Sequence, residues 1–420
     1  MRFGSSGIRA RYGPDLLRTA LEVGTILGAP GRDLIVGVDT RTTSPLLARA
    51  FSAGALSAGA LVRAAGLAPT PAVALATPSG GYGCMITASH NPEEYNGLKI
   101  FNPGGSSLLR AQQVEVEESL QKAGTATFQS EWNEFGRTVP AAILDSYRER
   151  ILDRIPEISG ISMVLDCGNG AGSVSSPGIL SGLGIRVHAL NCNPSGIFSR
   201  PSEPLREHLL YLPPLIKKLG AAGAVVHDGD ADRMVAFDAG GAIIPGDAML
   251  ILFARYLGVK RVVTTSDASM AVEEWMEVRR TPVGDAFVSE ELTRWGEFGG
   301  EPSGAWIFPD QSLCPDGPYA AALFCRIVAD WDLREELAKI PEYPMIRISL
   351  PCPDPASVMK SLGADSPTDG IRFADEDGWC LIRASGTEPK IRITAEGRTR
   401  GKADEMREKG LAAVKAGKKA

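Results

Sequence analysis

The feature that most constrains the fold is a strand-to-helix unit that occurs three times along the chain. Each unit is a short run of β-branched and aliphatic residues that stops at a polar residue and gives way to a turn or a helix. The runs are 34–38, 162–165 and 261–265; they end at Asp39, Asp166 and Ser266-Asp267, and helical stretches are predicted at 45–60 and 268–278. Such units build parallel sheets, whose active residues gather at the carboxyl ends of the strands. The recurrence predicts three related α/β domains.

The last part of the chain has a different pattern, in which strand-like runs alternate with helical stretches. The runs cover 345–350, 370–374, 379–383 and 390–396, and the helices cover 356–362 and 402–414. A chain of 420 residues is also too long for one compact domain. We therefore predict an α/β protein of three similar domains with mixed or parallel sheets, plus a smaller C-terminal α+β domain. The predicted boundaries are 1–140, 141–240, 241–344 and 345–420.

Composition argues against several classes of function. The net charge of −6 argues against a nucleic-acid or membrane-surface partner, because either favours a basic face. No apolar run reaches the length of a membrane span, and the N-terminus lacks a signal-peptide core, so we expect a cytoplasmic location. The seven cysteines form no Cys-x-x-Cys pair, which predicts reduced thiols rather than a zinc site or a disulfide framework. Monomer and homo-oligomer both stay open.

An acidic loop follows a short apolar strand near the middle of the chain. Asp228, Asp230 and Asp232 stand at alternate positions in this loop, and their charges repel one another unless a cation binds them. Carboxylate oxygens are hard ligands that select magnesium or calcium. A calcium-binding EF-hand needs Gly and Glu where Arg233 and Ala239 stand, so that interpretation fails. A solvated acidic turn is the simpler alternative, but the apolar strand that leads into the loop argues against it.

A second polar loop, 87–92, places Ser89 beside His90, and Lys99 follows shortly after. A serine in a turn before a helix is usually only a helix cap, and a histidine often has only a structural role. Here the serine is flanked by two groups that can handle protons. A phosphate on Ser89 would carry about two negative charges and would need a cation beside it, which the acidic loop can supply.

A third loop, 383–389, has the composition of a phosphate receptor. It combines hydroxyls and backbone N–H groups in a Gly-containing turn with arginines, which suit a phosphate dianion. Its candidate residues are Arg383, Ser385, Gly386 and Thr387, with Arg392 close behind. A generic Ser/Gly/Thr turn is the alternative.

Two Gly-rich stretches lie elsewhere in the chain. The turn 299–304 holds the carboxylate of Glu301 and the hydroxyl of Ser303, which suit sugar hydroxyls. The stretch 168–173 almost matches the dinucleotide-binding fingerprint, but Ser173 stands where the third glycine belongs. We therefore exclude a nicotinamide site.

With these loops assembled, the sequence resembles the α-D-phosphohexomutase superfamily along its whole length. The matching segments, in the family's order, are 3–9 (Phe-Gly-Ser-Ser-Gly-Ile-Arg), 37–41 (Gly-Val-Asp-Thr-Arg), 87–92, 228–233, 300–304 and 383–389. The resemblance implies three similar domains and a C-terminal lid around a central cleft. It also implies a mutase reaction. A phosphorylated Ser89 donates its phosphoryl group to a sugar monophosphate, the bisphosphate turns around, and Ser89 takes the group back from the other oxygen.

The resemblance also implies a role for each motif residue. One Mg²⁺ per chain would be bound by Ser89, Asp228, Asp230 and Asp232, and a hexose bisphosphate would act as activator. Arg9 and Arg233 would steady the phosphoserine, while Lys99 and His90 are candidates for proton transfer. The predicted sugar contacts are Glu301, Ser303 and Gly304. The predicted contacts to the non-reacting phosphate are Arg383, Ser385, Gly386, Thr387 and Arg392.

The sugar is the least constrained part of the prediction. Ala305-Trp306 stands where bacterial relatives usually place a histidine, and together with 281–285 this resembles the archaeal phosphoglucosamine mutase branch. We therefore expect interconversion of glucosamine 6-phosphate and glucosamine 1-phosphate, feeding UDP-N-acetylglucosamine synthesis. Phosphomannomutase/phosphoglucomutase activity is the alternative, because Glu301 would serve a neutral hydroxyl as well as an amine. A catalytically silent sugar-phosphate sensor and a phosphatase stay open, although a sensor has no need of Ser89 together with three aspartates.

Overall fold

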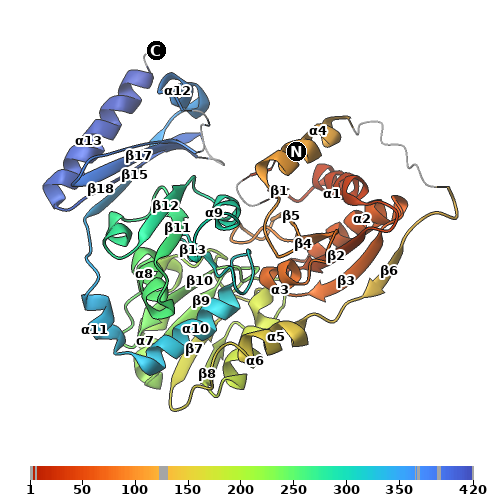
Figure 1. Ribbon diagram of the computed structural model, residues 1–420, viewed down its shortest axis with the longest axis horizontal. Helices are drawn as coiled ribbons and strands as arrows, with labels where there is room; N and C mark the ends of the chain where they lie inside the picture. Colours follow the sequence, from red (N-terminus) through yellow and green to blue (C-terminus); the bar gives the residue numbers. More distant parts are fainter. Residues whose placement is uncertain are drawn as a thin grey trace.

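The computed structural model describes residues 3–4, 7–122, 131–364, 366, 369–385 and 389–418. In these residues the chain forms four sheets in succession, each with its own strand order (Figure 1). The first three sheets combine parallel and antiparallel pairs. The fourth sheet is antiparallel in all of its pairs. The predicted fold class is confirmed.

The first sheet has six strands in the order β1-β5-β4-β2-β3-β6. The strands are β1 (Ile8–Arg11), β2 (Asp33–Val38), β3 (Leu61–Leu67), β4 (Tyr82–Ile86), β5 (Tyr95–Phe101) and β6 (Arg137–Pro140). The helices are α1 (Pro14–Leu27), α2 (Ser44–Ser57), α3 (Thr70–Leu75) and α4 (Arg110–Lys122). α1 and α2 approach so closely that a Cβ atom on Gly24 would lie 2.0 Å from the Phe51 carbonyl oxygen. Only glycine allows this backbone contact.

The second sheet has the order β10-β9-β7-β8. Its strands are β7 (Ser162–Asp166), β8 (Arg186–Leu190), β9 (Gly223–His227) and β10 (Met234–Asp238). Its helical elements are α5 (Leu144–Leu152), α6 (Ser176–Gly182), α7 (Leu212–Leu219) and the 3₁₀ helices η2 (Ala171–Val174) and η3 (Arg206–His208). Every residue of β7 and β9 is buried, as expected for strands covered on both faces. β7 and β9 are therefore the central, fully buried strands of this sheet.

The third sheet has the order β12-β11-β13-β14. Its strands are β11 (Arg261–Thr265), β12 (Glu277–Thr281), β13 (Phe298–Gly300) and β14 (Trp306–Ile307). Its helical elements are α8 (Gly246–Leu257), η4 (Met270–Glu274), α9 (Asp285–Leu292), α10 (Gly317–Asp330) and α11 (Leu333–Ala338). The helix predicted over 268–278 is wrong. Ser269 caps only the short helix η4, and the alternating run 277–281 pairs in parallel with β11 instead.

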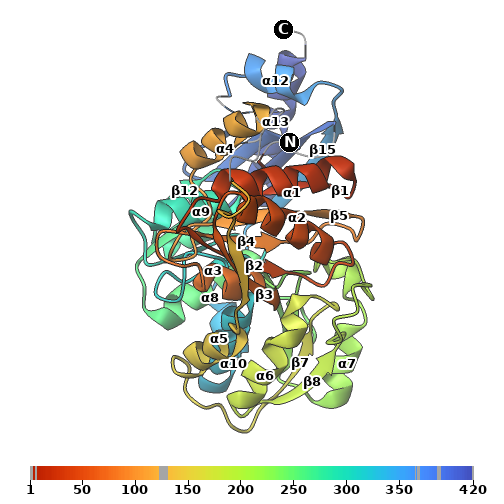
Figure 2. The same cartoon turned by 90° about the vertical axis from the view of Figure 1, so that its right-hand side faces the viewer.

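The C-terminal sheet has the order β15-β18-β17-β16. Its strands are β15 (Met345–Pro351), β16 (Ile371–Ala374), β17 (Gly378–Ala384) and β18 (Lys390–Gly397), and its helices are α12 (Pro355–Ser361) and α13 (Arg400–Gly417). α13 packs on β17 and β18. Two perpendicular views both place this domain at the top of the molecule, away from α5 and α6 (Figures 1 and 2).

The hydrophobic core explains why the C-terminal domain stands apart. One large cluster joins the first three sheets and includes Met85 of β4, Leu165 of β7 and Phe298 of β13. The C-terminal domain has a separate cluster that includes Ile393 and Met406. Buried apolar surface stabilises by about 25 cal/mol per Å², so the first three sheets are held as one body. The domain boundaries near 140, 240 and 344 stay a prediction.

Candidate active site

Two loops at the carboxyl ends of strands meet between the first and second sheets. The loop 87–92 follows β4, and the loop 228–233 follows β9. The Ser89 hydroxyl donates a hydrogen bond to Asp228 Oδ2 at 2.8 Å, and both side chains are buried. The predicted phosphoserine loop and the predicted metal loop are therefore in direct contact.

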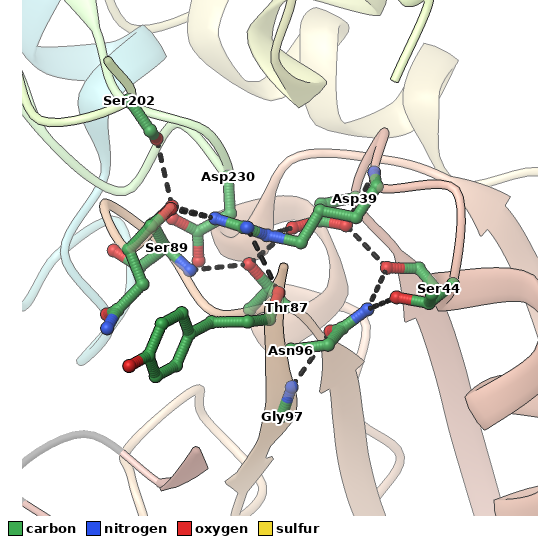
Figure 3. A network of polar contacts seen from close by, with 12 residues as sticks. Asp39, Ser44, Thr87, Ser89, Asn96, Gly97, Ser202 and Asp230 are labelled. Carbon is green, nitrogen blue, oxygen red and sulfur yellow. Dashed lines mark hydrogen bonds and ion pairs between the residues drawn. The ribbon is translucent and has the colours of Figure 1, made fainter. Parts of the chain in front are cut away.

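Ser89 has a backbone conformation that its surroundings must enforce. Its φ of 50° lies in the left-handed region, which is unfavourable for a residue with a Cβ atom. Its N–H donates to Thr87 Oγ1 at 2.8 Å, and its carbonyl accepts from Arg41 Nη2 at 2.7 Å and from Ser202 Oγ at 3.0 Å. Because Ser202 belongs to the second domain, both domains hold the serine in place (Figure 3).

Arg41 is the main support of the serine loop. Its guanidinium also donates to the carbonyls of Asn91 at 2.7 Å, Pro92 at 2.6 Å and Tyr95 at 3.1 Å, so it binds the loop at three points and the start of β5 at a fourth. Asp39 accepts from Arg41 Nε at 3.0 Å and neutralises its charge. Burial raises the pKa of Asp39 overall, although the Arg41 charge lowers it. The sequence pattern indicated Asp39 and Arg41 only as a strand end, not as the support of a loop.

The three aspartates of the metal loop converge on one point. Their ligand oxygens lie within 4.8 Å of one another, and all three side chains are buried. Lys99 Nζ donates to Asp230 Oδ2 at 2.7 Å and also to Asp232 Oδ2, and Thr70 donates to Asp230 Oδ2 at 2.6 Å. Asp230 Oδ1 and Asp232 Oδ1 are buried and have no hydrogen-bond partner among the described residues. Two such oxygens beside a third carboxylate fit a hard divalent cation.

The electrostatics of this cluster also favour a cation. Burial, followed by the charges of Asp232 and Asp230, raises the pKa of Asp228 well above its usual value. Burial also raises the pKa of Asp230, but the Lys99 charge and hydrogen bonds from Lys99 and Thr70 outweigh it and lower the pKa overall. Burial lowers the pKa of Lys99, yet the two carboxylates raise it overall. Lys99 thus neutralises part of the buried negative charge, and the rest is available to a metal ion.

Three more of the predicted residues surround Ser89. His90 Nδ1 lies 3.4 Å from Ser89 Oγ. The Arg233 charge, then burial, then the charges of Arg9 and Lys99 lower the pKa of His90 well below its usual value. Arg9 extends from β1, and Arg233 ends the metal loop, where its N–H donates to Asp228 Oδ1 at 3.2 Å. The predicted catalytic and metal-binding residues therefore form one cluster.

The predicted sugar loop packs directly on the metal loop. Arg233 and Ala305 form an isolated antiparallel β-bridge, and Met234 N–H donates to the Gly304 carbonyl at 2.9 Å. Gly304 has a φ of 100°, which requires glycine. Ser303 Oγ lies 3.4 Å from Glu301 Oε2. Glu301 and Ser303 are thus held next to the cluster around Ser89.

A second carboxylate that we did not assign to the site lies near Glu301. Asp285 begins α9 and is buried. Burial, followed by the Asp285 charge, raises the pKa of Glu301 to about 8, while Arg233 lowers it. The strand-end rule could have identified Asp285, because it follows β12 by a few residues, but the sequence does not show that it faces Glu301.

Arg383 of the predicted phosphate loop lies in the C-terminal domain, within electrostatic reach of Asp267 and Glu301 of the third domain. Arg383 of β17 and Arg392 of β18 are directly opposite each other in the sheet. Burial, together with the Arg392 charge, lowers the pKa of Arg383 overall, although the charges of Asp267 and Glu301 raise it. Ser385 N–H donates to the Lys390 carbonyl at 2.9 Å. The other two predicted residues, Gly386 and Thr387, lie outside the described residues.

Profiles of the phosphoglucomutase/phosphomannomutase family match almost the whole chain. Its alpha/beta/alpha domains I, II and III match residues 1–127, 145–241 and 245–343, and its C-terminal domain matches 345–412. The chain belongs to the phosphoglucomutase/phosphomannomutase family. As a member it is a phosphohexomutase, an isomerase that acts on phosphosugars. Among the described residues, no helix has the length and apolar character needed to cross a membrane.

Relatives in this family cover nearly all of the chain. A probable phosphoglucosamine mutase of Pyrococcus abyssi is 40% identical over 443 residues, covering 98% of this chain and 97% of the relative. One of Methanosarcina acetivorans is 38% identical over 424 residues, covering 97% of each.

Solved structures show the same fold at lower identity. A phosphoglucomutase/phosphomannomutase family protein of Burkholderia thailandensis has a TM-score of 0.85 at 24% identity, covering 99% of this chain and 97% of that one. N-acetylphosphoglucosamine mutase of Aspergillus fumigatus, solved with GlcNAc-6P and magnesium, has a TM-score of 0.62 at 16% identity, covering 99% and 96%.

We expect Arg41→Lys to lower the kcat of the mutase by about 100-fold, because misplacement of a reacting group by about 1 Å can have that effect. Lysine keeps the charge but cannot bind four carbonyls and Asp39 at once. The KM for the phosphosugar should change by less than about threefold, since the residue is remote from the sugar loop. Steady-state kinetics measure both constants.

Arg63→Lys, which alters an exposed pair with Asp33, is the control and should behave like the wild type. An Arg41→Lys enzyme with a normal kcat would contradict the role of Arg41.

We expect Asp228→Asn to weaken Mg²⁺ binding by about tenfold or more, because one of three charged ligands is lost. In the metal-free protein the same change should leave the melting temperature equal or higher, because it removes a carboxyl group whose charged form is disfavoured by burial and by Asp232 and Asp230, and it keeps an acceptor for Ser89. Calorimetric titration with Mg²⁺ and thermal melting in a chelator measure the two effects. Asp153→Asn, at an exposed position, is the control. Unchanged Mg²⁺ affinity would exclude Asp228 as a ligand.

Proposed function

We propose that this phosphohexomutase interconverts glucosamine 6-phosphate and glucosamine 1-phosphate. The observation that carries the proposal is the pair of buried carboxylates, Asp285 and Glu301, beside the predicted sugar position. Glu301 lies within electrostatic reach of Arg233 near the serine and of Arg383 in the C-terminal domain. Arg233 and Arg383 therefore supply positive charge at the two ends of the site, and Glu301 and Asp285 supply negative charge between them.

This charge pattern is complementary to a bisphosphorylated amino sugar. Such a molecule carries a phosphate dianion at each end and an ammonium group on the ring. An ammonium group relieves the repulsion between Asp285 and Glu301, whereas a neutral hydroxyl of glucose or mannose does not. The name probable phosphoglucosamine mutase, borne by the archaeal relatives, supports the same substrate.

Ser89 is the proposed carrier of the phosphoryl group, in the form of phosphoserine. Its hydroxyl is aimed at Asp228 by the 2.8 Å hydrogen bond, so its direction is fixed before a substrate binds. Phosphoryl transfer depends on in-line positioning and on neutralisation of charge. Arg9 and Arg233 would supply positive charge around the serine phosphate. A trace of hexose bisphosphate would serve to phosphorylate Ser89 at the start.

One Mg²⁺ per chain would be held by Asp228, Asp230 and Asp232 together with Ser89. When bound, it would draw negative charge from the phosphoryl oxygens. Lys99 is already bound by Asp230 and Asp232, which favours a role as counter-ion. His90, with Nδ1 at 3.4 Å from Ser89 Oγ, is the nearer candidate to accept the proton of the attacking sugar hydroxyl.

The remaining substrate contacts are proposed from the sugar and phosphate loops. Ser303 and Gly304 would place the sugar ring beside Glu301. The phosphate that does not react would be held by Arg383, Ser385, Gly386, Thr387 and Arg392. Arginine forks bind phosphate in two-point contacts, so the same group of residues could hold either end of the bisphosphate.

The first test compares three substrates on the purified enzyme. We expect the highest kcat/KM for glucosamine 6-phosphate, over mannose 1-phosphate and glucose 1-phosphate, with Mg²⁺ and a trace of hexose bisphosphate present. Ser89→Ala should abolish turnover of all three, because it removes the phosphoryl acceptor. Product is measured by chromatography of the sugar phosphates.

The outcomes separate the alternatives. Preference for a mannose or glucose ester would keep the mutase mechanism and reject the amino sugar. Release of phosphate without isomerisation would indicate a phosphatase. Absence of any turnover in the wild type would favour a sugar-phosphate sensor.

A second test uses the protonation of Glu301. With a pKa of about 8, Glu301 carries a proton in the free protein at pH 7. A bound ammonium group favours the carboxylate and lowers this pKa, so the proton must leave. We expect binding of glucosamine 6-phosphate to release protons at pH 7, because the ammonium group favours the carboxylate form of Glu301. Calorimetric titration of Ser89→Ala in two buffers with different ionisation enthalpies measures this release without turnover.

The controls for this test are a neutral sugar and a neutral side chain. Glucose 6-phosphate should release much less than glucosamine 6-phosphate, because its hydroxyl leaves Glu301 protonated. Glu301→Gln should bind glucosamine 6-phosphate more weakly and without that release. Equal proton release by both sugars would reject the contact between Glu301 and the amine.

A further inference from the structure

Two cysteines lie beside each other at the carboxyl ends of β7 and β8. Cys167 follows β7 directly and is buried, and Cys192 lies two residues beyond β8 and is half-buried. The Leu190 carbonyl accepts from Cys167 N–H at 3.2 Å and from Cys192 Sγ at 3.1 Å, so one oxygen gathers both residues. The side chains of the two cysteines are close enough for each thiol to shift the pKa of the other. A buried cysteine is therefore adjacent to a half-buried one.

The strand register brings the two cysteines close together, because Cys167 lies one residue and Cys192 two residues past the last pair of β7 and β8. β7 and β8 pair in parallel, with Asp166 opposite Leu190. Neighbouring strands lie about 4.8 Å apart, and disulfides span Cα separations of about 4.4–6.8 Å. The left-handed residue Asn191, with a φ of 50°, turns the chain just before Cys192. Cys192 Sγ lies 4.0 Å from the Leu165 carbonyl of β7.

The two thiols differ in reactivity. The hydrogen bond from the Cys167 thiol lowers the pKa of Cys192 although burial raises it. Burial raises the pKa of the thiols of Cys84, Cys314 and Cys325. Since the thiolate is the nucleophile, Cys192 is the favoured point of attack.

Each cysteine adjoins a segment that supports the active site. Gly170 N–H donates to the Cys167 carbonyl at 2.8 Å, and Ala171 N–H donates to the Gly229 carbonyl at 2.8 Å, so the turn after Cys167 supports the metal loop. The loop after Cys192 places the Phe198 ring 5.2 Å from the Arg41 guanidinium. A bond between the two sulfurs would act on the supports of both catalytic loops.

We propose that Cys167 and Cys192 form an oxidisable pair whose disulfide lowers mutase activity. The Cys192 thiolate attacks the O–O bond of a hydroperoxide; an S–O bond forms, and the other oxygen leaves as an alcohol or as water after taking up a proton. The Cys167 thiol then attacks that sulfur, the S–S bond forms, and hydroxide leaves with the Cys167 proton as water. Two thiols are oxidised, and one hydroperoxide is reduced. This pair does not depend on which hexose the enzyme accepts.

The test treats the whole protein with hydrogen peroxide and follows three readouts. We expect two of the seven thiols to be lost and peptide mapping to find a Cys167–Cys192 link. The kcat should fall and the Mg²⁺ dissociation constant should rise, each by about tenfold, since small displacements of catalytic groups have effects of this size or larger. Dithiothreitol should restore both. Cys192→Ala should keep its activity in peroxide, while Cys325→Ala, with a buried thiol in α10, should lose activity like the wild type.

Three results would overturn the proposal. The first is loss of activity without a Cys167–Cys192 link in the wild type. The second is a complete link with unchanged kcat and Mg²⁺ affinity. The third is equal inactivation of Cys192→Ala. The peptide map and the Mg²⁺ titration need no turnover, so they stay informative even if a variant folds poorly.

Discussion

Buried guanidinium groups that bind backbone carbonyls hold the functional loops of this enzyme. Arg41 binds the serine loop, and Arg200 donates to the His227 carbonyl at 2.7 Å just before the metal loop. Arg280 donates to one carbonyl at the end of β11 and to two carbonyls after it. Each guanidinium has an acidic partner, and these partners are Asp39, Asp166 and Glu273. A loop at a strand end leaves carbonyls that no strand or helix satisfies, and an arginine with five donors satisfies several at once. The repeated α/β unit thus comes with a repeated way of fixing its loop.

The same arrangement sets the electrostatics of the site. Rigid loops bring three carboxylates together, and Lys99 offsets only part of their charge. On flexible loops the three like charges would move apart. The carboxylates stay together because the backbone that carries them is held in place. At the sugar loop, the backbone likewise holds two like-charged side chains, Asp285 and Glu301, near each other. Positive and negative side chains therefore alternate along the site, from Arg233 near the serine, through Asp285 and Glu301, to Arg383 in the C-terminal domain.

The sequence predicted the architecture and most of the cluster because both follow local rules. The alternation of acids indicated a cation, and the charge expected on a phosphorylated Ser89, together with the family resemblance, linked the serine to the acidic loop. What it did not predict depends on contacts between distant segments. Arg200 stands in no distinctive pattern, and the position of Asp285 after a strand does not show its neighbours; only the folded chain brings the two residues to Asp166 and Glu301. The wrong helix over 268–278 has the same cause, since pairing with β11 outweighed the local helical preference.

The closed core of the C-terminal domain has a consequence for how substrate preference changes during evolution. Its hydrophobic residues pack on one another, so a copy from a related enzyme would bring most of its own stability with it. Its junction with the third domain includes the Glu396 carboxylate, which accepts from Met270 N–H at 2.8 Å. Asp285 and Glu301 would remain behind in the third domain after such an exchange. Recombination can therefore replace the proposed phosphate-binding residues and leave the proposed sugar-binding residues in place. The two parts of substrate recognition are then inherited separately.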